Sequence, residues 1–355
     1  MSITDQATDV REGESLDAAA VGAFLEKNII GVSGPFEIKQ FPAGFSNLTY
    51  LIRAGDREMV MRRPPFGRKA ATAHDMGREY RILSALYPVF PYCPKPLAYT
   101  EDESIIGAPF YVMERINGII LRRSLPDGMV LSPADAAALC RNMVALHCRL
   151  HGLDYKAAGL ESFGRPEGYV QRQVEGWVRR YRDARTPDVP DFEAVMAWLL
   201  ANMPGDTASP CIIHNDFKFD NLVLDAGNPL DIIGILDWEM ATIGDPLMDL
   251  GCSLAYWVNR DDPEEMHLLI MQPTLHEGMM TRKQIVELYG EISGRDIGQM
   301  DFYYAFGIFR LAVIAQQIYY RYYHGQTKDK RFAKLGFAAA LFEKSATRVI
   351  DGAGV

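Results

Sequence analysis

The stretch of residues 211–251, CIIHNDFKFDNLVLDAGNPLDIIGILDWEMATIGDPLMDLG, constrains the fold more than any other part of the chain. An apolar run at its start leads into a polar stretch that carries Asp216 and Asn221, five positions apart. A change from apolar to polar residues predicts a loop at the end of a strand, so both side chains should lie on one loop. A lone Asp in a loop is usually a turn former or a cap, so the residues that follow decide its meaning.

Those following residues predict a β-hairpin. Apolar runs at 222–224 and 232–236 flank a turn that is rich in Gly, Asn and Pro. Asp237 ends the second run, so the hairpin would return its carboxylate to a position beside the amide oxygen of Asn221. Oxygen ligands of this kind suit Mg²⁺ when nucleotide phosphates complete its coordination. Asp216 would then be left to orient an acceptor hydroxyl.

The series His214-Asn215-Asp216, Asn221 and Asp237-Trp238-Glu239 resembles the motifs of protein-kinase-like phosphotransferases. The closing GDPLMDLG is more similar to the aminoglycoside phosphotransferase and choline kinase superfamily. The resemblance implies an α+β, protein-kinase-like two-lobed fold, with a small antiparallel β-sheet N-lobe that carries a helix and a larger, mainly helical C-lobe. It implies ATP and Mg²⁺ as cofactors, Asp216 as catalytic base, and Asn221 and Asp237 as metal ligands.

Within that superfamily, several further segments look most like the branch related to the kinase part of acyl-CoA dehydrogenase fusion proteins. These segments are GFSNLTY, an arginine strand followed by Pro-Pro, GREYRIL, FGRPEGYVQRQVEGW and LDWEMATIGDPLMDLG. That resemblance implies a small-molecule hydroxyl acceptor, as a hydroxylated acyl or acyl-CoA.

The first part of the chain predicts a short helix and antiparallel strands. Ser15 is a good N-cap for a helix over about 16–27, and strands are expected at 36–41, 48–53 and 58–63. Between the first two strands, Gly44 lets backbone N–H groups approach an anion, and Ser46 and Asn47 add polar side chains. A single glycine there is more often an ordinary hairpin turn. The resemblance favours a nucleotide loop instead.

The third strand ends in Arg62-Arg63, and alternation allows only one of these two side chains to face a nucleotide cleft. In the wider kinase-like family a lysine of this strand pairs with phosphates and with a helix glutamate; here an arginine replaces it. We favour Arg62, with a solvated basic strand end as the alternative. Its expected partner is Glu79, whose spacing from Ile82 and Leu86 places it on the inward face of a helix. A surface pairing of Glu79 with a neighbouring arginine is the other possibility.

A strand is predicted over residues 109–114, and the chain should leave the small lobe at its end. The resemblance assigns the backbone at Glu114 and Ile116 to adenine binding. The expected organisation is a disordered tail over 1–14, an N-lobe over 15–117 and a C-lobe over 118–355. The C-lobe should begin with a helix that Ser132 caps and Pro133 starts.

Three further residues of the C-lobe, His147, His151 and Asp249, resemble catalytic groups in type, yet the pattern favours structural roles. No Ser or Cys nucleophile motif accompanies the two histidines, so buried, hydrogen-bonded histidines are expected. Asp249 is expected to open or brace a helix and to hydrogen-bond the catalytic loop, which His214 should also brace.

Composition excludes several classes of function. The chain of 355 residues carries a net charge of −9, which argues against nucleic-acid binding. The five cysteines form no CxxC pair, so buried thiols are expected, without disulfides or zinc. The apolar stretch 302–323 contains Arg310 and Arg321, which makes it a poor membrane span and a good buried helix. The start of the sequence lacks a signal-peptide pattern, so a cytoplasmic location is expected.

Two other functions remain open from the sequence. A cationic acceptor, aminoglycoside or choline-like, would need carboxylates or an aromatic cage, for which Glu239, Tyr256 and Trp257 are candidates. The arginines at 179, 180 and 182 would repel a polycation if they faced the cleft. A non-catalytic nucleotide-binding pseudokinase is the other alternative, although only the strand lysine departs from the motif. The oligomeric state and the choice between ATP and GTP stay open.

Overall fold

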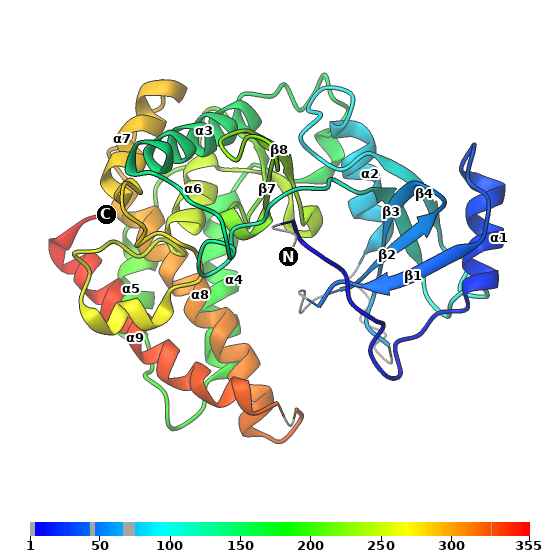
Figure 1. The fold of residues 1–355 in the computed structure, drawn as a ribbon. Helices are drawn as coiled ribbons and strands as arrows, with labels where there is room; N and C mark the ends of the chain where they lie inside the picture. The colour runs from blue at the N-terminus through cyan, green and yellow to red at the C-terminus, as the bar shows by residue number, and fades with distance from the viewer. Residues whose placement is uncertain (1–3, 43–46, 67–74, 328) are drawn as a thin grey trace. The chain divides into compact units, whose positions relative to one another are not determined.

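A computed structural model describes residues 4–42, 47–66, 75–327 and 329–355 (Figure 1). By their contacts the residues form two compact units, residues 1–120 with 221–240, and residues 121–220 with 241–355. The division expected at residue 117 counted residues 221–240 with the second lobe, whereas by contacts they group with the first unit.

The first unit is built on a five-stranded antiparallel sheet with the strand order β1-β2-β3-β5-β4. Its strands are β1 (Phe36–Gln40), β2 (Leu48–Ala54), β3 (Arg57–Arg63), β4 (Pro96–Thr100) and β5 (Phe110–Glu114). A two-residue turn joins β2 to β3, and Gly55 in this turn has a φ of 59°. Such a positive φ favours glycine, as the Gly-Asp pair in the sequence indicated.

Helix α1 (Ala18–Asn28) covers one face of this sheet. Its N-cap is Asp17, whose carboxylate accepts the N–H groups of Ala19 and Ala20, so the sequence-based choice of Ser15 is wrong. Met59 and Met61 of β3 lie in the core cluster that α1 completes. Because side chains alternate along a strand, Arg62 points to the opposite face.

That opposite face is where α2 (Met76–Leu86) contributes Glu79, since α2 contacts β4 and β5. The hairpin of β7 (Leu222–Leu224) and β8 (Ile232–Ile235) also belongs to the first unit. It is joined there by an antiparallel bridge between Ile119 and Leu224.

Residues 4–14 are not the disordered tail expected from the sequence. Thr8 forms an antiparallel bridge with Gln40, and the N–H of Asp5 donates to the carbonyl of Gly118 at 3.2 Å. The side chain of Gln40 donates to Glu14 at 2.5 Å. The segment is mostly polar in sequence, and it is ordered by these hydrogen bonds and by Val10, which packs against the core cluster of the sheet.

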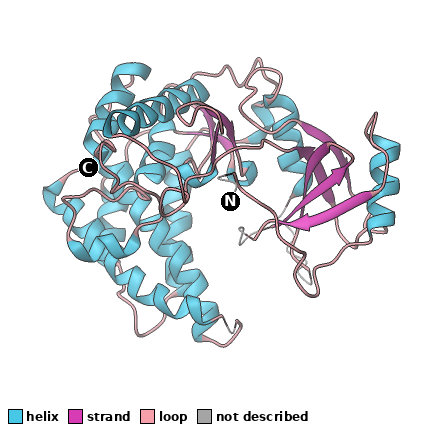
Figure 2. Ribbon diagram, viewed as in Figure 1, coloured by secondary structure: helices cyan, strands magenta, loops and turns pink. Residues whose placement is uncertain are grey.

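The second unit is mainly helical (Figure 2). Its helices of nine or more residues are α3 (Pro133–His151), α4 (Tyr169–Ala184), α5 (Glu193–Ala201), α6 (Pro246–Leu254), α7 (Arg282–Ser293), α8 (Met300–Tyr323) and α9 (Leu335–Arg348). A two-stranded sheet of β6 (Cys211–Ile213) and β9 (Thr242–Gly244) accompanies them. Ser132 caps α3 by accepting the N–H of Asp135, as predicted. The antiparallel sheet and the helical unit together confirm the predicted α+β fold.

Helix α8 forms the centre of the second unit, where it contacts α4, α6 and α9. It approaches α6 closely because both helices carry a glycine at the crossing. A Cβ on Gly251 would lie 2.2 Å from the carbonyl oxygen of Tyr303, and one on Gly307 would lie 2.2 Å from that of Gly251. Most of α8 is buried, as its apolar sequence predicted. Within the described residues, no helix combines the length and apolar character that a membrane span requires.

Candidate active site

The loop that carries Asp216 follows β6 in the second unit and is held by a buried carboxylate. Asp249, on α6, accepts the backbone N–H groups of His214 at 2.8 Å and Asn215 at 2.7 Å. Asn215 has a φ of 64°, a left-handed conformation that a non-glycine residue adopts only when its surroundings hold it. These bonds fix the backbone immediately before Asp216, which is the bracing role expected of Asp249.

Asp249 is itself held by the two histidines of α3. The Nε2 atoms of His147 and His151 each lie 3.1 Å from its Oδ2, and His151 Nδ1 lies 2.7 Å from the hydroxyl of Tyr289. A carboxylate only accepts hydrogen bonds, so both Nε2 atoms are assigned as protonated. Burial alone would raise the pKa of Asp249, but the bonds from His147 and His151 hold it well below its usual range.

The two histidines are therefore buried and hydrogen-bonded, as predicted. The ligand atoms of His147, His151 and Asp249 lie within 4.8 Å of one another, a spacing at which a metal ion could also bind. Each carboxylate oxygen of Asp249 already accepts a backbone N–H, which makes the group a hydrogen-bonded brace for the loop that carries Asp216.

The carboxylate of Asp216 is fixed by two side chains of the same unit. Lys218 Nζ donates to its Oδ1 at 3.0 Å and to its Oδ2 at 2.8 Å, and the hydroxyl of Tyr256 donates to Oδ1 at 2.9 Å. Burial alone would lower the pKa of Lys218, but Tyr256 and Asp216 raise it above its usual range. His214 Nδ1 accepts the N–H of Asp216 at 3.2 Å, so His214 also braces the loop.

Sequence reasoning missed Lys218 and the contact from Tyr256. Lys218 stands between two phenylalanines that are fully buried, so a charged side chain at this position of the loop was a usable signal. Tyr256 lies forty positions from Asp216 and gave no such signal.

In the first unit, Arg62 joins three carboxylates. Its Nη1 donates to Glu79 Oε1 at 2.5 Å, and its Nη2 donates to Asp237 Oδ1 at 2.9 Å and to Glu239 Oε2 at 3.4 Å. Burial alone would lower the pKa of Arg62, but Glu79 and Asp237 raise it well above its usual value. The buried pair of Arg62 and Glu79 is the one predicted.

Arg63 has different surroundings. Its Nε donates to the carbonyl of Pro64 and its Nη1 to that of Ile106, each at 3.1 Å. Its guanidinium lies 3.7 Å from the ring centroid of Phe66. Of the two strand arginines, Arg62 is thus the one that pairs with Glu79.

Asn221 and Asp237 lie at the two ends of the β7–β8 hairpin, where the pairing of the strands brings their segments of backbone together. Leu222 pairs with Ile235, and the N–H of Leu236 donates to the carbonyl of Asn221 at 2.8 Å. Asp237 follows directly and has a φ of 67°, which marks a sharp turn in the backbone after the strand. The hairpin return that the sequence predicted is therefore present.

The structure describes only some of the other residues that were predicted to bind the nucleotide. Gly44 and Ser46 lie outside the described residues, whereas Asn47 donates from Nδ2 to Glu239 Oε2 at 2.6 Å. The N–H of Glu114, at the end of β5, donates to the carbonyl of Lys95 at 2.8 Å, so this N–H is already bonded within the unit.

Ile116 packs against the β7–β8 hairpin. A Cβ on Gly234 would lie 2.6 Å from Ile116 Cδ1, so the glycine makes room for this side chain. The segment after β5 is thereby held against the strand that precedes Asp237.

The arginine cluster of α4 is exposed to solvent. Arg182 Nη2 pairs with Glu193 Oε2 at 2.7 Å, and the guanidinium of Arg180 lies 4.7 Å from the ring centroid of Trp177. These arginines therefore form a solvated helix face, the more common role of such a cluster.

Comparison with known proteins identifies the family of the chain. A family model described as "Phosphotransferase enzyme family" matches residues 37–277. The chain is similar to acyl-CoA dehydrogenase family member 10 of Mus musculus, with 36% identity over 325 residues, which cover 90% of this chain and 30% of that protein. It is also similar to acyl-CoA dehydrogenase family member 11 of Rattus norvegicus, with 32% identity over 93% of this chain and 43% of that protein. The chain thus spans less than half the length of these relatives.

Among solved structures, one described as a "putative aminoglycoside phosphotransferase" from Ralstonia eutropha has a TM-score of 0.79 and 31% identity, and covers 95% of this chain and 99% of its own. Choline kinase from Cryptosporidium parvum has a TM-score of 0.64 with 13% identity, covers 94% of this chain and 97% of its own, and shares the fold. The chain has a kinase-like phosphotransferase fold and belongs to the phosphotransferase enzyme family.

Proposed function

We propose that this protein transfers the γ-phosphoryl group of ATP, with Mg²⁺, to a hydroxyl group of a small acylated acceptor, a hydroxylated acyl or acyl-CoA. The observation that carries the proposal is the fixed carboxylate of Asp216, which three hydrogen bonds from Lys218 and Tyr256 hold in a single orientation. A carboxylate held this way can align an acceptor hydroxyl and take its proton during transfer.

The chain's own residues fit a metal nucleotide. Asn221 and Asp237 offer amide and carboxylate oxygens, the ligand types that Mg²⁺ prefers in proteins. When bound, Mg²⁺ would neutralise charge on the nucleotide phosphates. Arg62 is buried, and its Nε has no hydrogen-bond partner among the described residues. A buried donor without a partner is costly, and an anionic phosphate oxygen would satisfy it.

Glu79 keeps Arg62 in place for this role. The pair is almost fully buried, with 8% exposure of the Arg62 side chain and 2% of Glu79. Asn47, whose Nδ2 bonds Glu239, would help to position the nucleotide loop, together with Gly44 and Ser46 as the family resemblance implies. The backbone at Glu114 and Ile116 would receive the adenine ring.

An acyl acceptor is better supported than a cationic one. Lys218 Nζ lies 4.5 Å from the ring centroid of Tyr256, so a cation of the chain already contacts the face of this ring. Trp257 is 2% exposed and donates from Nε1 to the carbonyl of Met280 at 2.9 Å. Glu239 is engaged by Asn47 and Arg62. The relatives named acyl-CoA dehydrogenase family members add support for an acyl acceptor.

The test is ADP release by the purified chain with Mg-ATP and, in parallel, a series of hydroxyacyl-CoAs, choline and aminoglycosides. Phosphorylated product should be found by mass spectrometry with the hydroxyacyl-CoAs, and Asp216→Asn should abolish it. A preference for choline or an aminoglycoside would overturn the acceptor class. Nucleotide binding without transfer to any acceptor would favour a pseudokinase.

A further inference from the structure

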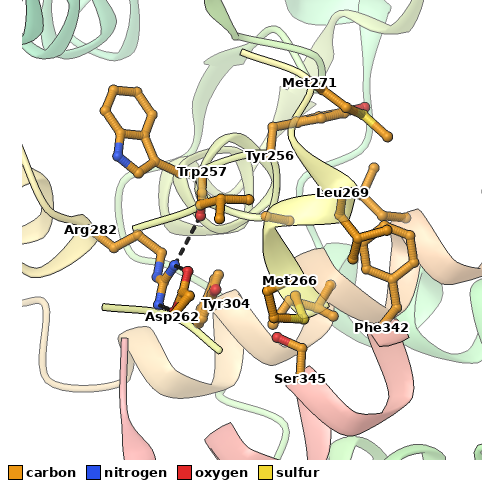
Figure 3. A pocket seen from close by; sticks show the side chains of 14 residues that line it. Tyr256, Trp257, Asp262, Met266, Leu269, Met271, Arg282, Tyr304, Phe342 and Ser345 are labelled. Atoms are coloured by element: carbon orange, nitrogen blue, oxygen red, sulfur yellow. Dashed lines mark hydrogen bonds and ion pairs between the residues drawn. The ribbon is translucent and has the colours of Figure 1, made fainter. Parts of the chain in front are cut away.

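A hollow in the second unit has the size of a small-molecule site. Its volume is about 570 Å³, and its walls are formed by residues 123–125 and by residues between 270 and 276. Ligand pockets typically enclose several hundred Å³. By contrast, the slot beside Arg282, Asp262 and Phe342 (Figure 3) has a volume of about 10 Å³, enough for one water molecule.

The walls of this hollow combine apolar and cationic chemistry. Leu125 and Leu275 supply apolar surface, and Arg123, His276 and Ser124 supply polar groups. Arg123 is exposed and forms no ion pair with any described residue, whereas the neighbouring Arg122 pairs with Asp220 at 2.7 Å. An uncompensated guanidinium beside apolar walls favours a ligand that is anionic at one point and apolar elsewhere.

His276 is held in a defined orientation at the hollow. Its Nε2 donates to the carbonyl of Leu131 at 2.8 Å, since a carbonyl only accepts. Its Nδ1 has no partner in the described part of the chain. The same wall is anchored by Thr274, whose hydroxyl donates to the carbonyl of Val258 at 2.8 Å, so this wall is formed before any ligand binds.

One residue of the wall connects the hollow to the catalytic loop. Gln272 is fully buried; its Oε1 accepts the N–H of Phe219 at 2.6 Å, and its Nε2 donates to the carbonyl of Tyr256 at 3.3 Å. Tyr256 in turn bonds the carboxylate of Asp216. The hollow and the candidate base are therefore joined by a short chain of hydrogen bonds within one unit.

We propose that this hollow binds an anionic group of the acceptor, with Arg123 as its charged contact and Leu125 and Leu275 against the adjoining apolar part. The inference rests on the proposed function and adds a binding site to it. A single free guanidinium matches one phosphate or carboxylate group, to which it can donate two parallel hydrogen bonds.

Binding is measured without phosphoryl transfer by titration calorimetry of the full chain with octanoyl-CoA, which carries phosphates but no acyl hydroxyl, and with octanoate, which carries a carboxylate. Arg123→Glu should weaken binding of the preferred ligand by about tenfold or more, because a charge-assisted contact becomes a repulsion. Arg141→Glu is the matched control, since Arg141 is an exposed arginine of α3 outside the hollow. The dissociation constant of the Arg141→Glu variant for the ligand should equal that of the wild type.

A second variant tests the space rather than the charge. Ser124→Trp places a large ring at the exposed edge of the hollow and should weaken binding while leaving the melting temperature unchanged. Binding of octanoyl-CoA but not octanoate identifies a phosphate ligand, and the reverse identifies a carboxylate. Equal affinities for Arg123→Glu and Arg141→Glu, or no binding of either ligand by the wild type, would overturn the proposal.

The two proposals fail separately. If octanoyl-CoA binds through Arg123 but no hydroxyacyl-CoA is phosphorylated, the proposed function fails and the site stands. If hydroxyacyl-CoA is phosphorylated and Arg123→Glu leaves its KM unchanged, the site fails and the proposed function stands.

Discussion

Mild acid should destabilise this protein through His151. Burial, with the neighbouring His147, lowers the pKa of the His151 ring from 6.5 to about 4 in the folded chain. The unfolded chain takes up this proton near pH 6.5, whereas the folded chain stays neutral until about pH 4, so protonation favours unfolding. The stability that the neutral ring contributes is fully present above pH 6.5 and is lost as the pH falls towards 4.

The magnitude follows from the width of that window. One proton contributes about 1.4 kcal/mol per pH unit, so the interval from 6.5 to about 4 corresponds to roughly 3 kcal/mol of unfolding free energy. The groups that face the ring act in opposite senses: Asp249 favours its protonation, and His147 and Arg295 oppose it. The hydroxyl of Tyr289, which bonds Nδ1 of His151, completes the surroundings of the ring.

Urea unfolding at pH values from about 7 to 4.5 measures this effect through the linkage slope. His151→Gln keeps an amide donor for Asp249 and an acceptor for Tyr289 but cannot take up the proton. Its unfolding free energy should therefore fall less steeply with acid than that of the wild type, and His267→Gln controls for removal of a histidine elsewhere. Parallel pH slopes for the wild type and His151→Gln would refute the reasoning.

Four further predictions concern the candidate site. Asp216→Ala should retain Mg-ATP binding in calorimetry but lose about 10²-fold or more in kcat, the usual contribution of a positioned base; normal turnover would contradict the assignment. Asp237→Ala should weaken nucleotide binding only when Mg²⁺ is present, and unchanged Mg²⁺ dependence would exclude it as a ligand. Arg62→Met should lower the unfolding free energy by about 3–5 kcal/mol, because it leaves Glu79 buried without its partner. Adding Glu79→Leu to this variant should restore part of the lost unfolding free energy. In steady-state kinetics, Arg63→Ala should raise the KM for ATP less than Arg62→Ala does.

Much of the local structure could be predicted because it depends on neighbouring residues. The Gly55-Asp56 turn and the Ser132 cap follow from backbone preferences that act over a few positions. The pattern failed where competing local signals were similar, as with Ser15 and Asp17 at the start of α1. It also missed β4, a five-residue strand that begins with Pro96 and is defined by its pairing with β5.

The segment of residues 4–14 shows the same limit of prediction from local sequence. Their bonds reach Gln40 and Gly118, which lie tens of positions away, so a polar segment with no apolar periodicity reads as a tail until its partners are known.

The sequence by itself determined the motif series from Asp216 to Asp237 and the pairing of Arg62 with Glu79. Strand alternation and helical spacing are local, and a buried charge requires a partner, so these rules could find that pair. Only the tertiary structure decided that Lys218 and Tyr256 fix the carboxylate of Asp216, and that residues around 123 and 275 enclose a hollow. The contact from Tyr256 and the walls of the hollow join segments far apart in the chain, and the packing of whole helices sets their distance. Lys218 is only two positions from Asp216, but the direction of its side chain depends on how the buried loop is packed.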